Sequence, residues 1–262
     1  MAKINKIMEM LLMNSQILLN VNFCNEIYTH FVEKNDRSVY VRAGYSMDGI
    51  RLVPQENVGI CLVCMDGHIR EVCLGDLDTP VDIDGSCSFI SVEMDSCFNR
   101  KALDVCDIKP FGRLLTDDMG CADQNSGDSL KAAMDIIIGY VESCEPLWKN
   151  AVMTDAGVMK QADTIYTTNG KVSVTELAAD MGCTVRHVHR RFVEELGMGP
   201  KRFARIVRIR ETVRRMLEHP GGHVTDCMDD MGYSDQAHFQ REFRWYTGIT
   251  PRSLLKMLDG KS

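Results

Sequence analysis

The chain has no run of apolar residues long enough to cross a bilayer, which argues against a transmembrane helix. Apolar residues gather at 11–13 and 17–19, but Glu9 and the polar residues 14–16 interrupt them. No small-residue cleavage site follows. We therefore predict an amphipathic helix in this region, a cytoplasmic location and no membrane partner.

Patterns typical of enzymes are also missing. The sequence shows no Ser/His/Asp set, no glycine-rich phosphate loop and no cluster of metal ligands. We expect neither catalysis nor a cofactor. Cysteine, in contrast, is frequent, with 11 in 262 residues. In a chain of this size without an export signal, we interpret them as reduced thiols rather than disulfides.

Cys61 and Cys64, with Cys73 nearby, suggest a metal or redox site. On a strand, however, Cys61 and Cys64 point to opposite faces, whereas a metal-binding pair usually straddles a turn. We predict ordinary core packing. The alternatives are a cysteine-based redox or metal-responsive regulator, a partner-binding protein and an alkyl-acceptor enzyme.

Charge divides the chain into two parts. Residues 1–154 carry 13 Lys and Arg against 23 Asp and Glu, whereas residues 155–262 carry 17 against 14. The net charge of −7 would make the whole chain a poor general binder of nucleic acid. Basic residues instead concentrate at 186–215, where ten oppose three acidic ones. This concentration favours phosphate contact over a merely solvated helix face.

The last hundred or so residues contain one pattern twice. The first copy consists of Leu177, Ala178, Met181, Gly182, Arg190, Phe192, Gly197 and Pro200. The second consists of Cys227, Met228, Met231, Gly232, Arg241, Phe243, Gly248 and Pro251. Each copy predicts a helix, a glycine turn and a second helix, so the sequence indicates two helix-turn-helix units.

Local signals set the predicted boundaries. In the first copy, residues 174–181 form one helix, Gly182 ends it, and Thr184 caps a helix at 185–195. In that second helix the residues expected to face inward are Val185, Val188, Phe192 and Val193. In the second copy, residues 224–231 form the first helix. Ser234 or Asp235 then caps the helix that contains Phe239 and Phe243.

Residues 201–219 predict a helix about 27 Å long between the two copies. Its length could hold two recognition helices about one DNA turn apart, in successive major grooves. One side is apolar, and the other carries Arg205 and Arg208 among several basic residues. We predict that part of this basic side contacts phosphate.

These residues resemble the AraC/XylS family of bacterial transcription regulators. The resemblance covers roughly residues 155–258 and includes the segment MGYSDQAHFQREFRWYTGITPRSL. It implies a sequence-specific regulator, most often an activator, that binds double-stranded promoter DNA and contacts RNA polymerase. Where relatives usually have a small residue, this chain has Met228. We therefore expect more affinity from the first copy and the linker than from the second copy.

The resemblance also implies which residues contact DNA. The first recognition helix would contribute Arg186, His187, His189 and Arg190. The second would contribute Gln236, Ala237, Gln240 and Arg241. Arg205 and Arg208 would add phosphate contacts from the linker helix.

The first part of the chain reads mostly as strands. We predict strands at 37–45, 58–65, 68–74 and 86–94, with Asp66-Gly67 as a hairpin turn. Helices are predicted at 95–105, 129–143 and 147–168. The overall expectation is an α+β protein with domains at 1–154 and 155–262. The first is β-rich, as in many relatives, with a barrel-like form as one option, and would sense a small-molecule or other signal or form a homodimer. The second is an all-α double helix-turn-helix domain.

Overall fold

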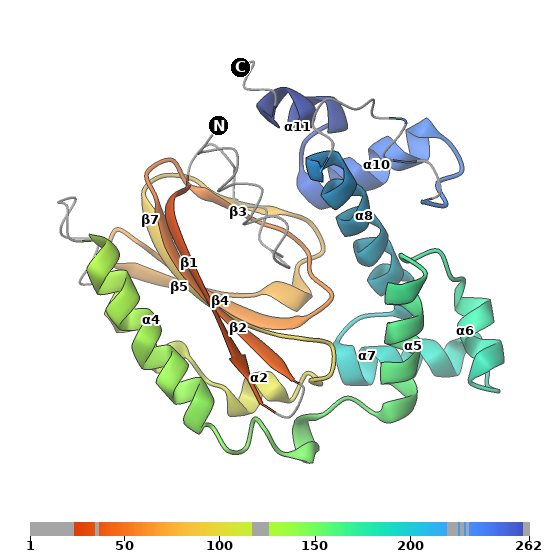
Figure 1. The fold of residues 1–262 in the computed structure, drawn as a ribbon, viewed down its shortest axis with the longest axis horizontal. Helices are drawn as coiled ribbons and strands as arrows, with labels where there is room; N and C mark the ends of the chain where they lie inside the picture. Colours follow the sequence, from red (N-terminus) through yellow and green to blue (C-terminus); the bar gives the residue numbers. More distant parts are fainter. Residues whose placement is uncertain are drawn as a thin grey trace.

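A computed structural model describes residues 24–34, 37–116, 126–218, 225, 228 and 231–258. Figure 1 shows a β-sheet region followed by a helical region, which confirms the predicted α+β class. The helix predicted near residues 1–20 lies outside the described residues. In the described part of the chain, no helix combines the length and apolarity needed to cross a bilayer.

The main sheet has five antiparallel strands in the order β1-β2-β7-β4-β5. They are β1 (Cys24–Glu33), β2 (Ser38–Ser46), β4 (Val58–Met65), β5 (His68–Cys73) and β7 (Cys87–Met94). A separate pair consists of β3 (Ile50–Leu52) and β6 (Val81–Ile83). Among these strands β1 and β5 are opposite edges, so the described sheet is open rather than a closed barrel.

The β4–β5 hairpin forms as predicted around Asp66 and Gly67. Both residues have positive φ, 48° and 73°, as a two-residue type I′ turn requires. The turn fixes the register in which Cys64 pairs with Ile69 and Cys61 pairs with Val72. It thereby places Cys73, at the end of β5, next to the segment that leads toward β6.

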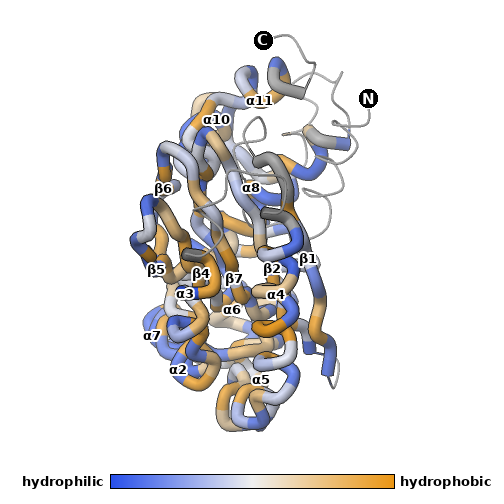
Figure 2. Tube along the Cα trace, turned by 90° about the vertical axis from the view of Figure 1, so that its left-hand side faces the viewer, coloured by the Kyte–Doolittle hydropathy of each residue, from blue (hydrophilic) through white to orange (hydrophobic). Residues whose placement is uncertain are grey.

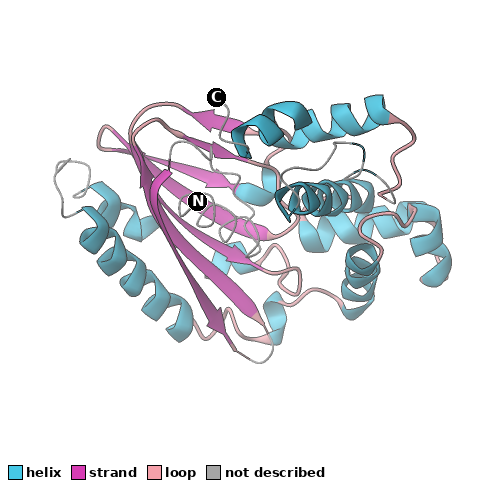
Figure 3. Cartoon of the chain, turned by 45° about the horizontal axis from the view of Figure 1, so that its top comes forward, coloured by secondary structure: helices cyan, strands magenta, loops and turns pink. Residues whose placement is uncertain are grey.

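The two faces of the main sheet bury different cores. Cys64, Val41 and Val92 belong to a core that includes residues of α4 (Ser126–Ser143), which covers this face in Figure 3. Cys61 and Phe89 belong to a second core that includes residues of β3 and β6. The prediction that Cys61 and Cys64 point to opposite faces and pack in the core is confirmed, since both are fully buried. Figure 2 shows the apolar central strands β4 and β7 running through the middle of the molecule.

The helix predicted at 95–105 is largely wrong. Only α2 (Ala102–Val105) is helical, and turns precede it. The Asp95 carboxylate accepts hydrogen bonds from the backbone N–H groups of Ser38 and Cys97, and the Asn99 side chain accepts one from Lys101. Such side-chain bonds to nearby backbone compete with helix formation. The short elements η2 (Lys109–Gly112) and α3 (Arg113–Thr116) follow.

The helical region begins later than predicted. Residues 147–155 are not α-helical, although they include η3 (Asn150–Val152), and α5 runs from Ala156 to Thr167. Asp155 sets this start, because its side chain accepts from the N–H groups of Gly157 and Val158 as an N-cap. Trp148, which precedes it, is buried in the core of the sheet region instead.

The remaining helices follow the predicted order. They are α6 (Val174–Asp180), α7 (Val185–Leu196), α8 (Pro200–Glu218), α10 (Gln236–Thr247) and α11 (Pro251–Leu258). The helix predicted at 224–231 lies mostly outside the described residues; Thr225 and Met228 are helical. These helices share one core, to which a residue of the sheet region, Val53, also belongs.

Candidate nucleic-acid interface

The first helix-turn-helix unit consists of α6 and α7. Ser173 and Glu176 form a reciprocal capping box at the start of α6, and Gly182 takes the left-handed conformation after it with φ of 61°. The Thr184 hydroxyl then accepts from the N–H of His187 and caps α7, as predicted. Gly182 after α6 and Thr184 before α7 therefore set the two ends of the turn locally.

The inward face of α7 differs in part from the prediction. Val188 and Phe192 are buried, but Val185 and Val193 are exposed. Leu196 completes the buried row at a spacing of four residues, so the helix is rotated slightly from the predicted stripe.

On the opposite side of α7, the four residues expected to contact DNA lie on the surface. Arg186, His189 and Arg190 are exposed and His187 is half-buried. One nitrogen of Arg190 lies 3.3 Å from Nδ1 of His187, and Nε of Arg190 lies 3.8 Å from Glu194. These neighbours restrict the Arg190 side chain without covering it.

The second unit has the same local design. Gly232 has φ of 73°, and the Asp235 carboxylate caps α10 by accepting from the N–H of His238 at 2.7 Å. Of the two predicted caps, Asp235 is therefore the one used. The core side of α10 comprises Phe239, Phe243 and Tyr246. The four residues expected to contact DNA are all exposed: Gln236, Ala237, Gln240 and Arg241.

Met228, the departure from the usual small residue, packs partly buried against the shared helical core. Tyr233 lies edge-on to Phe239 with ring centroids 5.1 Å apart. The flexible Met side chain is thus accommodated in this core.

Helix α8 joins the two units and lies between them in Figure 1. Its predicted apolar side is buried at Phe203, Ile206 and Val213. Pro200 begins the helix, where its missing N–H costs nothing. Nineteen residues give a helix about 28 Å long, so the expected spacer is present as one continuous element.

The basic side of α8 is more engaged than the sequence suggested. Nε of Arg205 lies 3.1 Å from the Glu242 carboxylate, and Arg208 lies 3.3 Å from the same group. The Arg205 guanidinium also stacks over the Trp245 ring at 3.6 Å. Burial among these groups lowers the pKa of Arg205, although the guanidinium stays charged. Arg205 and Arg208 therefore tie α8 to α10.

Two further arginines of α8 reach the sheet region. Arg202 pairs with Asp78 at 2.9 Å and also donates to the carbonyl of Leu77. Arg210 pairs with Glu56, whose side chain is fully buried. No pattern in the sequence predicts these pairs, because their partners lie more than a hundred residues away and surface acidic residues are common.

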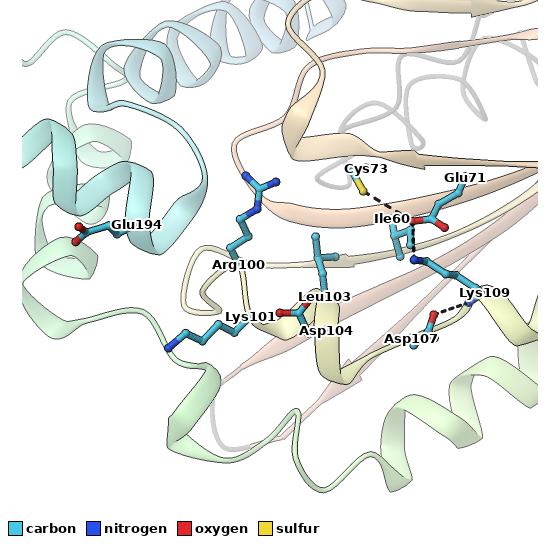
Figure 4. Close-up of a pocket in the computed structure, with 10 residues that line it drawn as sticks. All are labelled: Ile60, Glu71, Cys73, Arg100, Lys101, Leu103, Asp104, Asp107, Lys109 and Glu194. Carbon is cyan, nitrogen blue, oxygen red and sulfur yellow. Dashed lines mark hydrogen bonds and ion pairs between the residues drawn. The ribbon is translucent and has the colours of Figure 1, made fainter.

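A cleft lies where the sheet region meets α7. It has a volume of about 490 Å³ and is lined by Ile60, Glu71, Cys73, Arg100, Lys101, Leu103, Asp104, Asp107, Lys109 and Glu194. Figure 4 shows charged side chains of both signs around the apolar Ile60 and Leu103. Lys109 pairs with Glu71 at 3.3 Å, and Arg100 stands on the side toward α7.

The thiols of Cys61 and Cys87, in the described sheet region, are buried and unreactive. Burial raises the pKa of the Cys61 thiol well above its usual range, and it raises the pKa of Cys87 to about 11. Thiols of this kind are poor nucleophiles and poor metal ligands at neutral pH. Among the described residues, no group of three or more Cys, His, Asp or Glu is placed to hold a metal ion. The redox or metal-responsive alternative is therefore not supported.

Comparison with known proteins places the helical region in a family. A helix-turn-helix domain model matches residues 177–257. The transcriptional activator RhaS of Klebsiella pneumoniae strain 342 is 34% identical over 84 residues, covering 32% of this chain and 30% of that protein. RhaS of Escherichia coli O157:H7 strain EC4115 is 30% identical over 94 residues, covering 34% and 32%. Residues 177–257 are an AraC/XylS-type helix-turn-helix domain.

The match to these curated relatives spans about a third of their length. Over most of the chain, solved structures of ToxT from Vibrio cholerae are similar at low identity. An apo form from strain SCE256 has a TM-score of 0.43 and 11% identity, covering 88% of this chain and 97% of that one. A form from strain O395 bound to a naphthalenyl-butenoic acid has a TM-score of 0.42 and 10% identity, covering 89% and 98%.

Proposed function

We propose that this protein is a sequence-specific, DNA-binding transcription regulator. It inserts α7 and α10 into successive major-groove segments of one promoter site, with α8 as the spacer. Arg186, His189 and Arg190 read bases in the first segment, and His187 lies beside them. Gln236, Ala237, Gln240 and Arg241 form the second reading face.

One observation carries this proposal. Both recognition helices bury an aromatic face in one shared core and leave a polar face uncovered, and α8 contributes to the same core between them. Arg and Gln side chains are suited to base edges in the major groove. Two such faces on one scaffold are what a reader of two adjacent half-sites needs.

Arg205 and Arg208 are proposed as phosphate contacts. Each guanidinium has five N–H donors, and the Glu242 carboxylate can accept only some of them. Arg205 keeps 31% of its side chain exposed, so it retains donors for a phosphate, whereas Arg208 keeps 16%. We expect Arg205 to contribute more to phosphate binding than Arg208.

The remaining roles follow from the division of the chain. We propose domains at residues 1–154 and 155–262. In support, the first core includes residues up to Val152, and the helical core, apart from Val53, consists of residues from Val158 onward, on either side of the Asp155 cap. The first domain would sense a small molecule or another signal, or mediate homodimer formation. The regulator would act in the cytoplasm, as an activator that contacts RNA polymerase.

The test uses the full chain and DNA selected from a random library. Fluorescence anisotropy with the selected site and with scrambled DNA, over a range of salt concentrations, should show specific affinity and a log–log slope set by phosphate contacts. The double variant Arg190→Ala with Gln240→Ala should lose the preference for the selected site. Lys149→Ala, an exposed lysine of the sheet region, is the matched loss of one positive charge and should leave the preference unchanged.

No enrichment of any sequence, or no affinity even at low salt, would refute the proposal. It would favour a partner-binding protein that no longer reads DNA. Equal binding of selected and scrambled DNA by the native chain would refute base reading alone.

A further inference from the structure

Three aspartates of the sheet region lie within seven residues of one another in the sequence, between the end of β5 and the middle of β6. Asp76 ends η1 (Leu74–Asp76), Asp78 lies in the following loop, and Asp82 is in the middle of β6. We call residues 76–82 the aspartate segment. Each aspartate makes a contact that leads to a helix of the AraC/XylS-type domain.

Asp76 acts on the first recognition helix through Arg100. Its carboxylate lies 2.8 Å from Nη2 of Arg100, while the Arg100 backbone N–H donates to the carbonyl of Glu195 at 2.8 Å. The guanidinium lies against the glycine that ends α7, since a Cβ added at Gly197 would lie 2.9 Å from Nη1. Arg100 therefore contacts the last turn of α7 with both its backbone and its side chain.

Asp82 acts on the second recognition helix through Arg51. Nη2 of Arg51 donates to Asp82 at 2.8 Å, and Nη1 donates to the carbonyl of Thr247, the last residue of α10, at 3.1 Å. A Cβ added at Gly248 would lie 3.0 Å from Nη1 of Arg51. The hydrogen bond from Arg51 lowers the pKa of Asp82, in agreement with a charged pair.

Asp78, between the other two aspartates in the sequence, contacts both α8 and α10. Its carboxylate pairs with Arg202 in the first turn of α8 at 2.9 Å, and its carbonyl accepts from the Trp245 indole N–H of α10 at 2.7 Å. The same short segment therefore contacts α8 and α10 directly, and it holds the arginines that contact the ends of α7 and α10.

The two arginines occupy equivalent places in the two units, although Arg100 donates to α7 through its backbone N–H and Arg51 donates to α10 through its guanidinium. Each arginine sits at the C-terminal end of a recognition helix, beside its left-handed glycine, where the helix dipole places partial negative charge. Each is oriented by an aspartate of the same segment. Asp76 and Asp82 thus act on the recognition helices through an arginine, whereas Asp78 contacts α10 directly.

We propose that the aspartate segment sets the position of the two recognition helices relative to each other, through Arg100 on α7 and Arg51 on α10. Arg51, Arg100, Asp76 and Asp82 are positioning residues in this arrangement. The inference rests on the proposed function, because its consequence is a fixed distance between two DNA half-sites. A domain joined only by α8 would tolerate a change in that distance more readily.

The experiment compares the native chain with the double variant Asp76→Ala and Asp82→Ala. Affinity is measured for the selected site, for the same site with one base pair inserted or deleted between its halves, and for each half alone. Because the pairs are half-exposed and each contributes little stability, the variant should fold normally. We expect the preference for the native spacing to fall about fivefold to tenfold, with unchanged affinity for the isolated halves.

Glu71→Ala is the matched control. It removes an ion pair of the same region, with Lys109, that contacts no recognition helix, and it should retain the native spacing preference. An unchanged preference in the double variant would overturn the inference. Tighter binding of every site with the same preference would also overturn it, because the contacts would then restrain the domain rather than position it.

Hydrogen exchange without DNA separates this inference from the proposed function. In the double variant, amides in the last turns of α7 and α10 should exchange faster, whereas those of α6 should not change. If the native chain reads no DNA, the proposed function fails, and the DNA-dependent part of this inference fails with it. If exchange is unchanged, only the positioning role fails.

Discussion

The two helix-turn-helix units are built alike at their turns but are attached to α8 in different ways. In the first unit, the Phe203 ring of α8 lies edge-on to Phe192 of α7 at 6.0 Å and to Tyr166 of α5 at 5.4 Å. In the second, Glu242 of α10 lies between Arg205 and Arg208 of α8. An apolar cluster attaches one recognition helix, and an ionic cluster attaches the other.

The difference is sharpest at one equivalent position. Arg191 and Glu242 each directly precede the buried phenylalanine of their recognition helix. Arg191 pairs with Asp155 at the start of α5, at 3.0 Å, whereas Glu242 pairs with arginines of α8. Each recognition helix is thus linked to the helix that precedes its own unit, α5 in the first and α8 in the second, but with the charges reversed. The repeat has kept the connection and changed its chemistry.

The largest expected effect comes from the apolar attachment. Phe203→Ala should destabilise the helical region by about 3–5 kcal/mol, because it leaves a cavity between two aromatic partners of a fully buried ring. Hydrogen exchange should show the loss of protection first in α5 and α7. Val193→Ala, at an exposed site on α7, is the control and should change stability little. Equal loss in α10 would mean that the two attachments are not separate.

The ionic attachment of α10 to α8 should contribute less to the free energy of unfolding than the apolar attachment of α7. Glu242→Gln should cost about 2 kcal/mol in urea unfolding, since it leaves two partly buried guanidinium groups without their anion. The matched control is Glu211→Gln. Glu211 also pairs with two arginines, Arg214 and Arg215, but all three belong to α8, so the change should not loosen α10. If both variants lose the same stability, the ion pairs between Glu242 of α10 and the arginines of α8 stabilise the protein no more than ion pairs within α8.

The proposed difference in reading strength can be tested on DNA. Arg190→Ala should cost about 1–3 kcal/mol at the base it reads and relax the preference there. Arg241→Ala should cost less, since we expect the first copy to supply more affinity. Binding to all single-base variants of the selected site measures both. A uniform loss across those variants after Arg190→Ala would show that this residue contacts backbone and not bases.

The smallest effect concerns the two helix caps. A hydrogen bond from Arg191 is the main cause that lowers the pKa of Asp155, whereas backbone N–H of His238 is the main cause for Asp235. A lowered folded pKa gives stability above the unfolded value, about 3.9, that is lost as pH falls through the folded value. In Arg191→Gln, the pKa of Asp155 should rise toward its ordinary value, whereas the pKa of Asp235 should stay unchanged. A carboxyl titration followed by NMR measures both. If the pKa values of both carboxyl groups changed, Arg191 would not be the specific cause of the lowered pKa of Asp155.

Local chemistry accounts for what the sequence could predict. The caps Thr184 and Asp235 and the turn glycines act within a few residues, so both units and the hairpin at Asp66 were predictable. The inward placement of Val185 and Val193 failed, because apolar residues on a short helix do not reveal which row the core selects. The start of α5 was missed because Leu147 and Trp148 are apolar but belong to the other core.

The contacts between the two regions were beyond prediction for a different reason. Arg210 and Glu56, or Trp245 and Asp78, are brought together by the tertiary fold across long stretches of chain. A single sequence marks such residues only as charged or aromatic. The basic side of α8 therefore suggested phosphate contact alone, although Arg202 and Arg210 pair with the sheet region.

The hydrogen bond from Trp245 to Asp78 also gives the molecule a built-in optical probe. The chain has two tryptophans, and Trp148 is buried in the other core, where its indole donates to Val141. Replacing Trp148 with Phe would leave an emission that comes from the junction of the two regions. Any effector, DNA site or solvent condition that separates them would shift its wavelength, so the junction can be followed in real time without a label.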